Sequence, residues 1–94
     1  MWQAMLLSFL AGVLGGNAYP HFTSGITARK FPTVFGASPV VNLIAGWSGL
    51  AVAGLCLWGA HPVRHPGWAL LGLAIGTLPM GLFHAAGRTV GPRD

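Results

Sequence analysis

Acidic side chains are almost absent from this 94-residue sequence, because Asp94, the last residue, is the only Asp or Glu. General acid and base catalysis by paired carboxylates, and Mg²⁺ or Ca²⁺ sites built from carboxylate cages, therefore lack their essential side chains. Charged residues of both signs make up only 6% of the chain, whereas an ordinary soluble domain has about 25%. With 53% hydrophobic residues, the composition predicts a single integral membrane domain over residues 1–94.

Other absences narrow the range of functions. Cys56 is the only cysteine, so neither a disulfide within the chain nor a haem-attachment motif can form. There is no glycine-rich loop followed by Lys and Ser or Thr to cradle a phosphate, and no serine has a base supported by a carboxylate. We therefore expect a non-enzymatic protein without a cofactor.

The few charges divide the chain into three uncharged segments, at 1–28, 31–63 and 65–87. Each segment is long enough to cross a bilayer core of about 30 Å, which requires roughly 20 residues of helix. The sequence predicts an all-α membrane protein with three transmembrane helices and an interfacial loop between the first two. We expect the helices at about 2–18, 39–60 and 67–86.

Two alternatives to this topology are weaker. A helix of a soluble bundle has a polar stripe opposite its buried face, but residues 40–59 and 69–83 are apolar around most of the helix. Gly16 and Ala18 resemble a signal-peptide cleavage site, yet no basic residue precedes the first apolar run as a signal peptide requires. We therefore expect the first segment to be a membrane span.

The distribution of Lys and Arg predicts the orientation. Arg29, Lys30, Arg88 and Arg93 fall on one side of the predicted membrane and Arg64 on the other. Because cytoplasmic loops carry the excess of positive charge, we expect a cytoplasmic C-terminus and an N-terminus outside. These cations at the membrane edges suit anionic lipid headgroups, and they do not form the basic stripe of a nucleic-acid-binding protein.

Aromatic and small residues follow the predicted spans. Trp2, Trp58 and Trp68 fall at the outer interface, as in an aromatic belt, but Trp47 lies inside the second span, where its indole N–H needs a partner or a packed interface. Small residues recur every four positions at Ala4, Ser8, Gly12 and Gly16, at Ala45, Gly49 and Ala53, and at Gly72 and Gly76. Such stripes allow close helix packing, either within one chain or between copies in a homo-oligomer.

The loop from Tyr19 to Asn42 is the most unusual segment, since it combines aromatics, prolines, hydroxyls and two cations. Ser38 followed by Pro39 is typical of a helix N-terminus. The predicted topology brings Asn17, His21, Asn42 and His84 to one membrane depth, where buried polar groups need partners. The candidate ligand-binding residues are Asn17, His21, Arg29, Lys30, Asn42 and His84. Alternatively, the polar side chains simply tie the loop to the helix ends.

Four histidines invite a metal or haem hypothesis. His21 and His84 are expected on the inner side, and His61 and His65 on the outer side. Their spacing matches no closed zinc site, and His21 and His61 each lie beside a proline. We therefore expect no metal, and residues 61–66 are best interpreted as a short, rigid outer turn.

A resemblance to known proteins rests on a pattern of about a quarter of the chain: Asn17, Pro20, His21, Phe22, Phe31, Pro32, Thr33, Phe35, Gly36, Ser38, Pro39, Val40 and Asn42. This pattern resembles that of a family of small, uncharacterised bacterial multi-pass inner-membrane proteins. The resemblance implies a location in the bacterial inner membrane. It implies no activity.

Two functions follow as hypotheses from the sequence. The first is a non-enzymatic membrane protein that acts as a homo-oligomer or as an accessory subunit of a larger membrane complex. The second is a small-ligand module whose polar pocket at the cytoplasmic membrane edge binds a lipid, quinone or haem.

Overall fold

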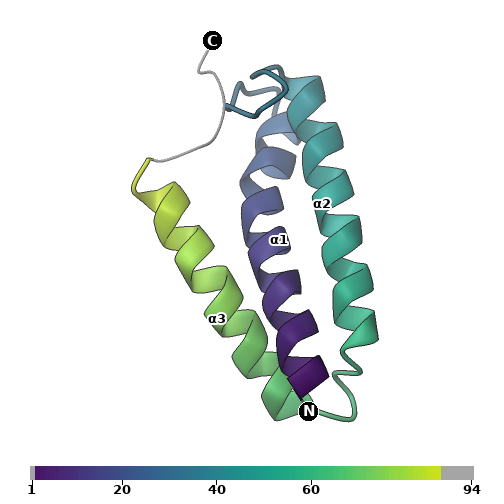
Figure 1. The fold of residues 1–94 in the computed structure, drawn as a ribbon. Coiled ribbons are helices and arrows are strands. Elements are labelled where there is room, and N and C mark those ends of the chain that lie inside the picture. The colour runs from purple at the N-terminus through teal and green to yellow at the C-terminus, as the bar shows by residue number, and fades with distance from the viewer. Residues whose placement is uncertain (1, 88–94) are drawn as a thin grey trace.

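Three helices make up the computed structural model, which describes residues 2–87. They are α1 (Trp2–Ile26), α2 (Pro39–Gly59) and α3 (Pro66–Ala85). Figure 1 shows α1 between the other two, and it packs against both. The loop at 27–38 lies at one end of the molecule, and the turn at 60–65 lies at the other end with the start of α1. The expectation of an all-helical protein is confirmed.

Two of the helices in the described part of the chain, α2 and α3, are long and apolar enough to cross a membrane. Their observed bounds differ from the predicted ones by at most one residue at each end. The expected start of α2 is also confirmed, because Ser38 is its N-cap and Pro39 its first residue. The Ser38 hydroxyl accepts a hydrogen bond from the backbone N–H of Val41 at 3.1 Å, which satisfies one of the unpaired donors of the first turn.

The first helix is longer than expected. We predicted an end near residue 18, but α1 continues through Pro20 to Ile26. A proline inside a helix removes a hydrogen bond and costs about 3 kcal/mol. Tertiary contact opposes this cost, because the backbone of Phe22 packs directly against Gly46 of α2. The loop is therefore shorter than expected, because residues 19–26, which we assigned to it, form the last two turns of α1.

The interior consists of small side chains. Within residues 2–87, every buried hydrophobic side chain is an alanine, at positions 4, 11, 18, 37, 53, 60 and 69. The largest fully buried side chains are instead Asn42 and Ser8. Large apolar side chains point outward along all three helices, among them Leu10, Ile44 and Leu78. This distribution is the reverse of the one in a soluble domain, whose large apolar residues are mostly buried.

The predicted stripes of small residues lie at the contacts between helices. A Cβ atom on Gly72 would lie 2.7 Å from the backbone oxygen of Met5, and one on Gly12 would lie 2.7 Å from that of Leu73. On the other side of α1, a Cβ on Gly49 would lie 2.7 Å from that of Ala18. The stripes therefore serve packing within the chain, and they leave the outer faces of α2 and α3 to the large apolar residues.

Candidate functional site

Asn42 organises the end of the molecule beneath the first loop. Its side chain is fully buried. The amide Nδ2 donates to the carbonyl oxygen of Phe31 at 2.7 Å and to that of Ser38 at 3.0 Å, and it lies 3.3 Å from that of Ala37. Because carbonyl oxygens only accept hydrogen bonds, these neighbours fix which side of the amide is nitrogen. Asn42 thereby attaches the loop to the first turn of α2.

His21 completes this network from α1. Its Nδ1 lies 2.7 Å from Oδ1 of Asn42. Since the orientation of the amide makes Oδ1 the acceptor, Nδ1 of His21 carries the hydrogen and donates the hydrogen bond. In the neutral imidazole, Nε2 then has a lone pair. It has no hydrogen-bond partner among residues 2–87.

His84 of α3 is held in the same tautomer by a different partner. Its Nδ1 lies 2.9 Å from the backbone oxygen of Met80, one turn earlier in the helix. A carbonyl oxygen can only accept, so Nδ1 donates and Nε2 of the neutral ring has the lone pair. This Nε2 also has no hydrogen-bond partner within the described chain.

Aromatic contacts bring the two imidazoles together around Phe31. The ring centroids of His21 and His84 are 6.2 Å apart, and that of Phe31 is 4.9 Å from His21 and 6.1 Å from His84. Phe83 contacts His84 from the same helix, with centroids 5.4 Å apart. Residues from α1, the loop and α3 thus form one cluster of rings.

A cavity of about 220 Å³ lies beside this cluster. Its polar lining consists of Asn17, His21, Thr33 and His84. Apolar residues line the rest, including Leu14 of α1, Ala45 and Gly49 of α2, and Phe35 of the loop. The cavity therefore joins a polar end under the loop to an apolar groove between α1 and α2.

The predicted ligand-binding residues divide into three groups. Asn17, His21 and His84 line the cavity. Asn42 does not line it, but positions His21 by a hydrogen bond. Arg29 and Lys30 are exposed on the loop and do not line it. Arg88 and Arg93, which we assigned to the same side of the membrane as Arg29 and Lys30, lie outside the described residues.

Sequence reasoning missed Thr33. Its hydroxyl donates to the carbonyl oxygen of Gly36 at 2.6 Å and accepts from the N–H of Phe35 at 2.9 Å, so it closes the tight turn that forms one wall of the cavity. Gly36 has φ of +117°, a conformation that favours glycine. A Thr three residues before a Gly was the available signal for this turn.

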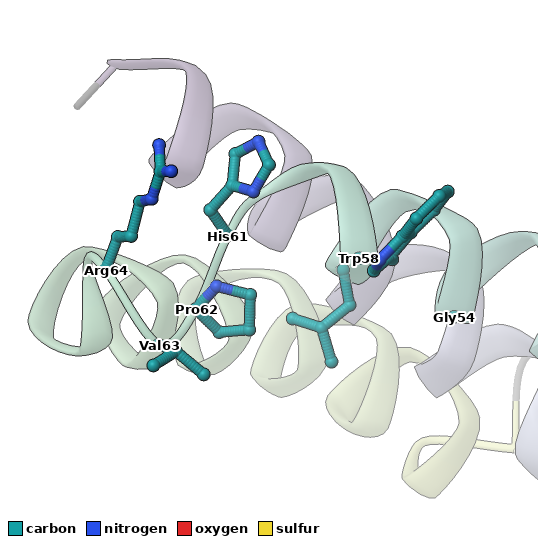
Figure 2. Close-up of a pocket in the computed structure, with 7 residues that line it drawn as sticks. Gly54, Trp58, His61, Pro62, Val63 and Arg64 are labelled. Atoms are coloured by element: carbon teal, nitrogen blue, oxygen red, sulfur yellow. The ribbon is translucent and has the colours of Figure 1, made fainter.

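A second, larger hollow of about 570 Å³ lies at the opposite end, beside the turn between α2 and α3. Figure 2 shows His61 and Arg64 extending from one side of this turn, and Val63 on the other. Trp58, Val63 and Arg64 are all exposed. His61 has a positive φ of 51°, and its carbonyl accepts from the N–H groups of Arg64 and His65. These hydrogen bonds agree with the short turn predicted for residues 61–66, although Pro66 is already the first residue of α3.

Within residues 2–87, no three His, Cys, Asp or Glu side chains are grouped so that they could hold a metal ion. His61 and His65 lie in the turn at one end of the molecule, and His21 and His84 lie near the other. The histidines therefore do not converge on one centre.

Comparison of the chain with protein-family models, with curated proteins and with solved structures finds no match.

Proposed function

We propose that this protein is a small integral membrane protein of the bacterial inner membrane in which all three helices cross the bilayer. The observation that supports this topology is the outward placement of the large apolar side chains on every helix. At 25 residues, α1 is about 37 Å long, more than the bilayer core of about 30 Å. It is less apolar than α2 and α3. Because it is the central helix, α2 and α3 cover part of its surface, and less of it would face lipid.

The orientation that we propose places the loop at 27–38 in the cytoplasm and the N-terminus outside. Arg29 and Lys30 are exposed on this loop, where they would meet anionic headgroups. Trp2, Trp58 and Trp68 belong to the opposite end and are exposed, as residues of an outer aromatic belt would be. Cysteine labelling from each side of inverted vesicles, at positions 29 and 63, tests the orientation.

The function that we propose is non-enzymatic association with a second protein surface, either a copy of this chain or a subunit of a larger membrane complex. Trp47 carries this proposal. It lies eight residues into α2, about 12 Å from the start of the helix, and its side chain is 64% exposed. The indole N–H has no partner within residues 2–87, and an unpartnered donor in hydrocarbon is costly. A protein partner would satisfy the donor and bury the ring.

Native mass spectrometry of the protein in mild detergent tests this proposal. We expect a complex that contains more than one chain, and a weaker complex after Trp47→Leu. Trp58→Leu is the matched control, because Trp58 is also exposed on α2 but lies at the end of the helix. A lone monomer for the unmodified protein, with no co-purifying subunit, would contradict the association.

The cavity beneath the loop supports a second candidate, a binding module for an amphipathic small molecule such as a lipid or quinone. Its polar end and apolar groove match a headgroup and a tail. Its volume of about 220 Å³ is below the roughly 300–1,000 Å³ of sites for drug-sized ligands, so a haem macrocycle does not fit. Mass spectrometry of an organic extract of the purified protein would reveal a retained ligand, and loss of that ligand after His84→Ala would locate it.

A further inference from the structure

We propose that the cavity binds the hydroxylated ring of a membrane quinol, with the quinol hydroxyls donating hydrogen bonds to Nε2 of His21 and of His84. This inference rests on the second candidate function and specifies its ligand. It also predicts which oxidation state of the ligand binds, because the two states differ in hydrogen-bond donors.

The tautomers of the two histidines supply the first argument. Both Nδ1 atoms are occupied as donors, to Asn42 Oδ1 and to the Met80 carbonyl. In the neutral form, each ring therefore has its acceptor at Nε2 and no further donor. Thr33 adds no donor for a ligand, because its hydroxyl already donates to the carbonyl oxygen of Gly36 within the turn. Asn17, the fourth polar residue of the lining, has an amide that can both donate and accept, so it suits either oxidation state of the ligand. A ligand that bonds both histidines must donate hydrogen bonds.

The charge of the lining supplies the second argument. None of the cavity residues is acidic, Lys or Arg, so neither a cationic nor an anionic headgroup finds a fixed opposite charge there. A metal ion would find two imidazoles and no third His, Cys, Asp or Glu among the described residues. The cavity suits a neutral molecule, and a quinol ring with two hydroxyls is neutral.

Size and shape supply the third argument. An apolar cavity of about 150 Å³ holds one benzene ring, and this cavity of about 220 Å³ has room for such a ring and its substituents. Phe35 lines the cavity as an aromatic wall. From the polar end, Leu14, Ala45 and Gly49 continue the lining between α1 and α2, where an isoprenoid tail would lie in the apolar part of the membrane.

The test uses the full chain, purified in mild detergent and titrated under anaerobic conditions with a short-chain benzoquinol and, separately, with its oxidised quinone. Calorimetry measures both dissociation constants. The quinone has carbonyl acceptors where the quinol has donors, so we expect the quinol to bind at least about tenfold more tightly, the effect of one net hydrogen bond of about 1.4 kcal/mol. His84→Leu should lower quinol affinity by about the same factor.

The matched control is His65→Leu, which changes a histidine at the opposite end of the molecule whose side chain makes no cap hydrogen bond. It should leave quinol affinity unchanged. A second measurement does not depend on any variant: in ¹⁵N-histidine NMR spectra, the quinol should shift the Nε2 resonances of His21 and His84 and leave their Nδ1 resonances protonated.

Three outcomes overturn the inference. They are equal affinity for quinol and quinone, unchanged Nε2 resonances in the presence of quinol, and quinol binding that His84→Leu leaves intact in a folded protein. If an organic extract nevertheless contains another lipid that His84→Ala removes, the pocket function stands and only the quinol is refuted. If there is no extracted ligand and no binding, both are refuted.

Discussion

Replacing Asn42 with leucine is the substitution that we expect to destabilise the loop most. Leucine has the same number of side-chain heavy atoms and the same branching as asparagine but no hydrogen-bonding group, so all interactions of the amide are lost. The carbonyls of Ala37 and Ser38 each keep a backbone donor, from Phe31 and from residue 42 itself. The carbonyl of Phe31 and Nδ1 of His21 lose the only partners that they have within residues 2–87.

The expected magnitude follows from these two groups. An unsatisfied buried donor or acceptor costs about 1–3 kcal/mol, so Asn42→Leu should lower the free energy of unfolding by about 2–6 kcal/mol. Water that enters the adjacent cavity and bonds His21 would bring the loss toward the lower end of this range. Reversible unfolding by SDS in mixed micelles, followed by circular dichroism, measures the change.

Asn17→Leu is the matched control for this prediction. Asn17 is exposed, and its side chain has no hydrogen-bond partner in the described part of the chain, so the same substitution should change stability by no more than about 0.5 kcal/mol. Equal effects of the two substitutions would refute the reasoning. The hydrogen bonds of Asn42 would then contribute no more to stability than an exposed asparagine without partners does.

Three further substitutions test the packing and the turn. Gly76→Ala should destabilise the α1–α3 contact by about 1–3 kcal/mol, because the new methyl group would overlap backbone atoms of α1. Gly81 lies in the same helix, and a Cβ atom there would meet nothing within 4 Å. Gly81→Ala should therefore be neutral or stabilising in the same SDS titration. Ser8→Ala should leave the unfolding free energy unchanged or raise it by about 1 kcal/mol, because the buried hydroxyl has no hydrogen-bond partner within residues 2–87; a clear loss would indicate an interaction of Ser8 with a bound molecule. Thr33→Val keeps the shape of the side chain but removes both hydrogen bonds of the turn, so thermal unfolding monitored by circular dichroism should show a loss of about 1–2 kcal/mol, and an unchanged midpoint would contradict the role of the hydroxyl.

The sequence was most informative about α2 and α3, because local rules decide them. An apolar segment bounded by charges and prolines is a helix almost regardless of its neighbours, and the Ser38-Pro39 start needs only adjacent residues. The end of α1 was predicted wrongly for the opposite reason. Pro20 is a local stop signal, but the contact that carries the helix past it comes from Gly46, 26 residues later in the chain.

The sequence by itself also predicted that Asn17, His21, Asn42 and His84 would share one membrane depth, since helix lengths and topology set depth. It did not determine which residues touch. Only the tertiary structure decides that Asn42 bonds His21 and stays out of the cavity, that Arg29 and Lys30 stay away, and that Thr33 forms a wall. The physical reason is that depth follows from counting residues along each helix, whereas contact depends on how the helices rotate about their axes when the small residues of α1 pack against α2 and α3.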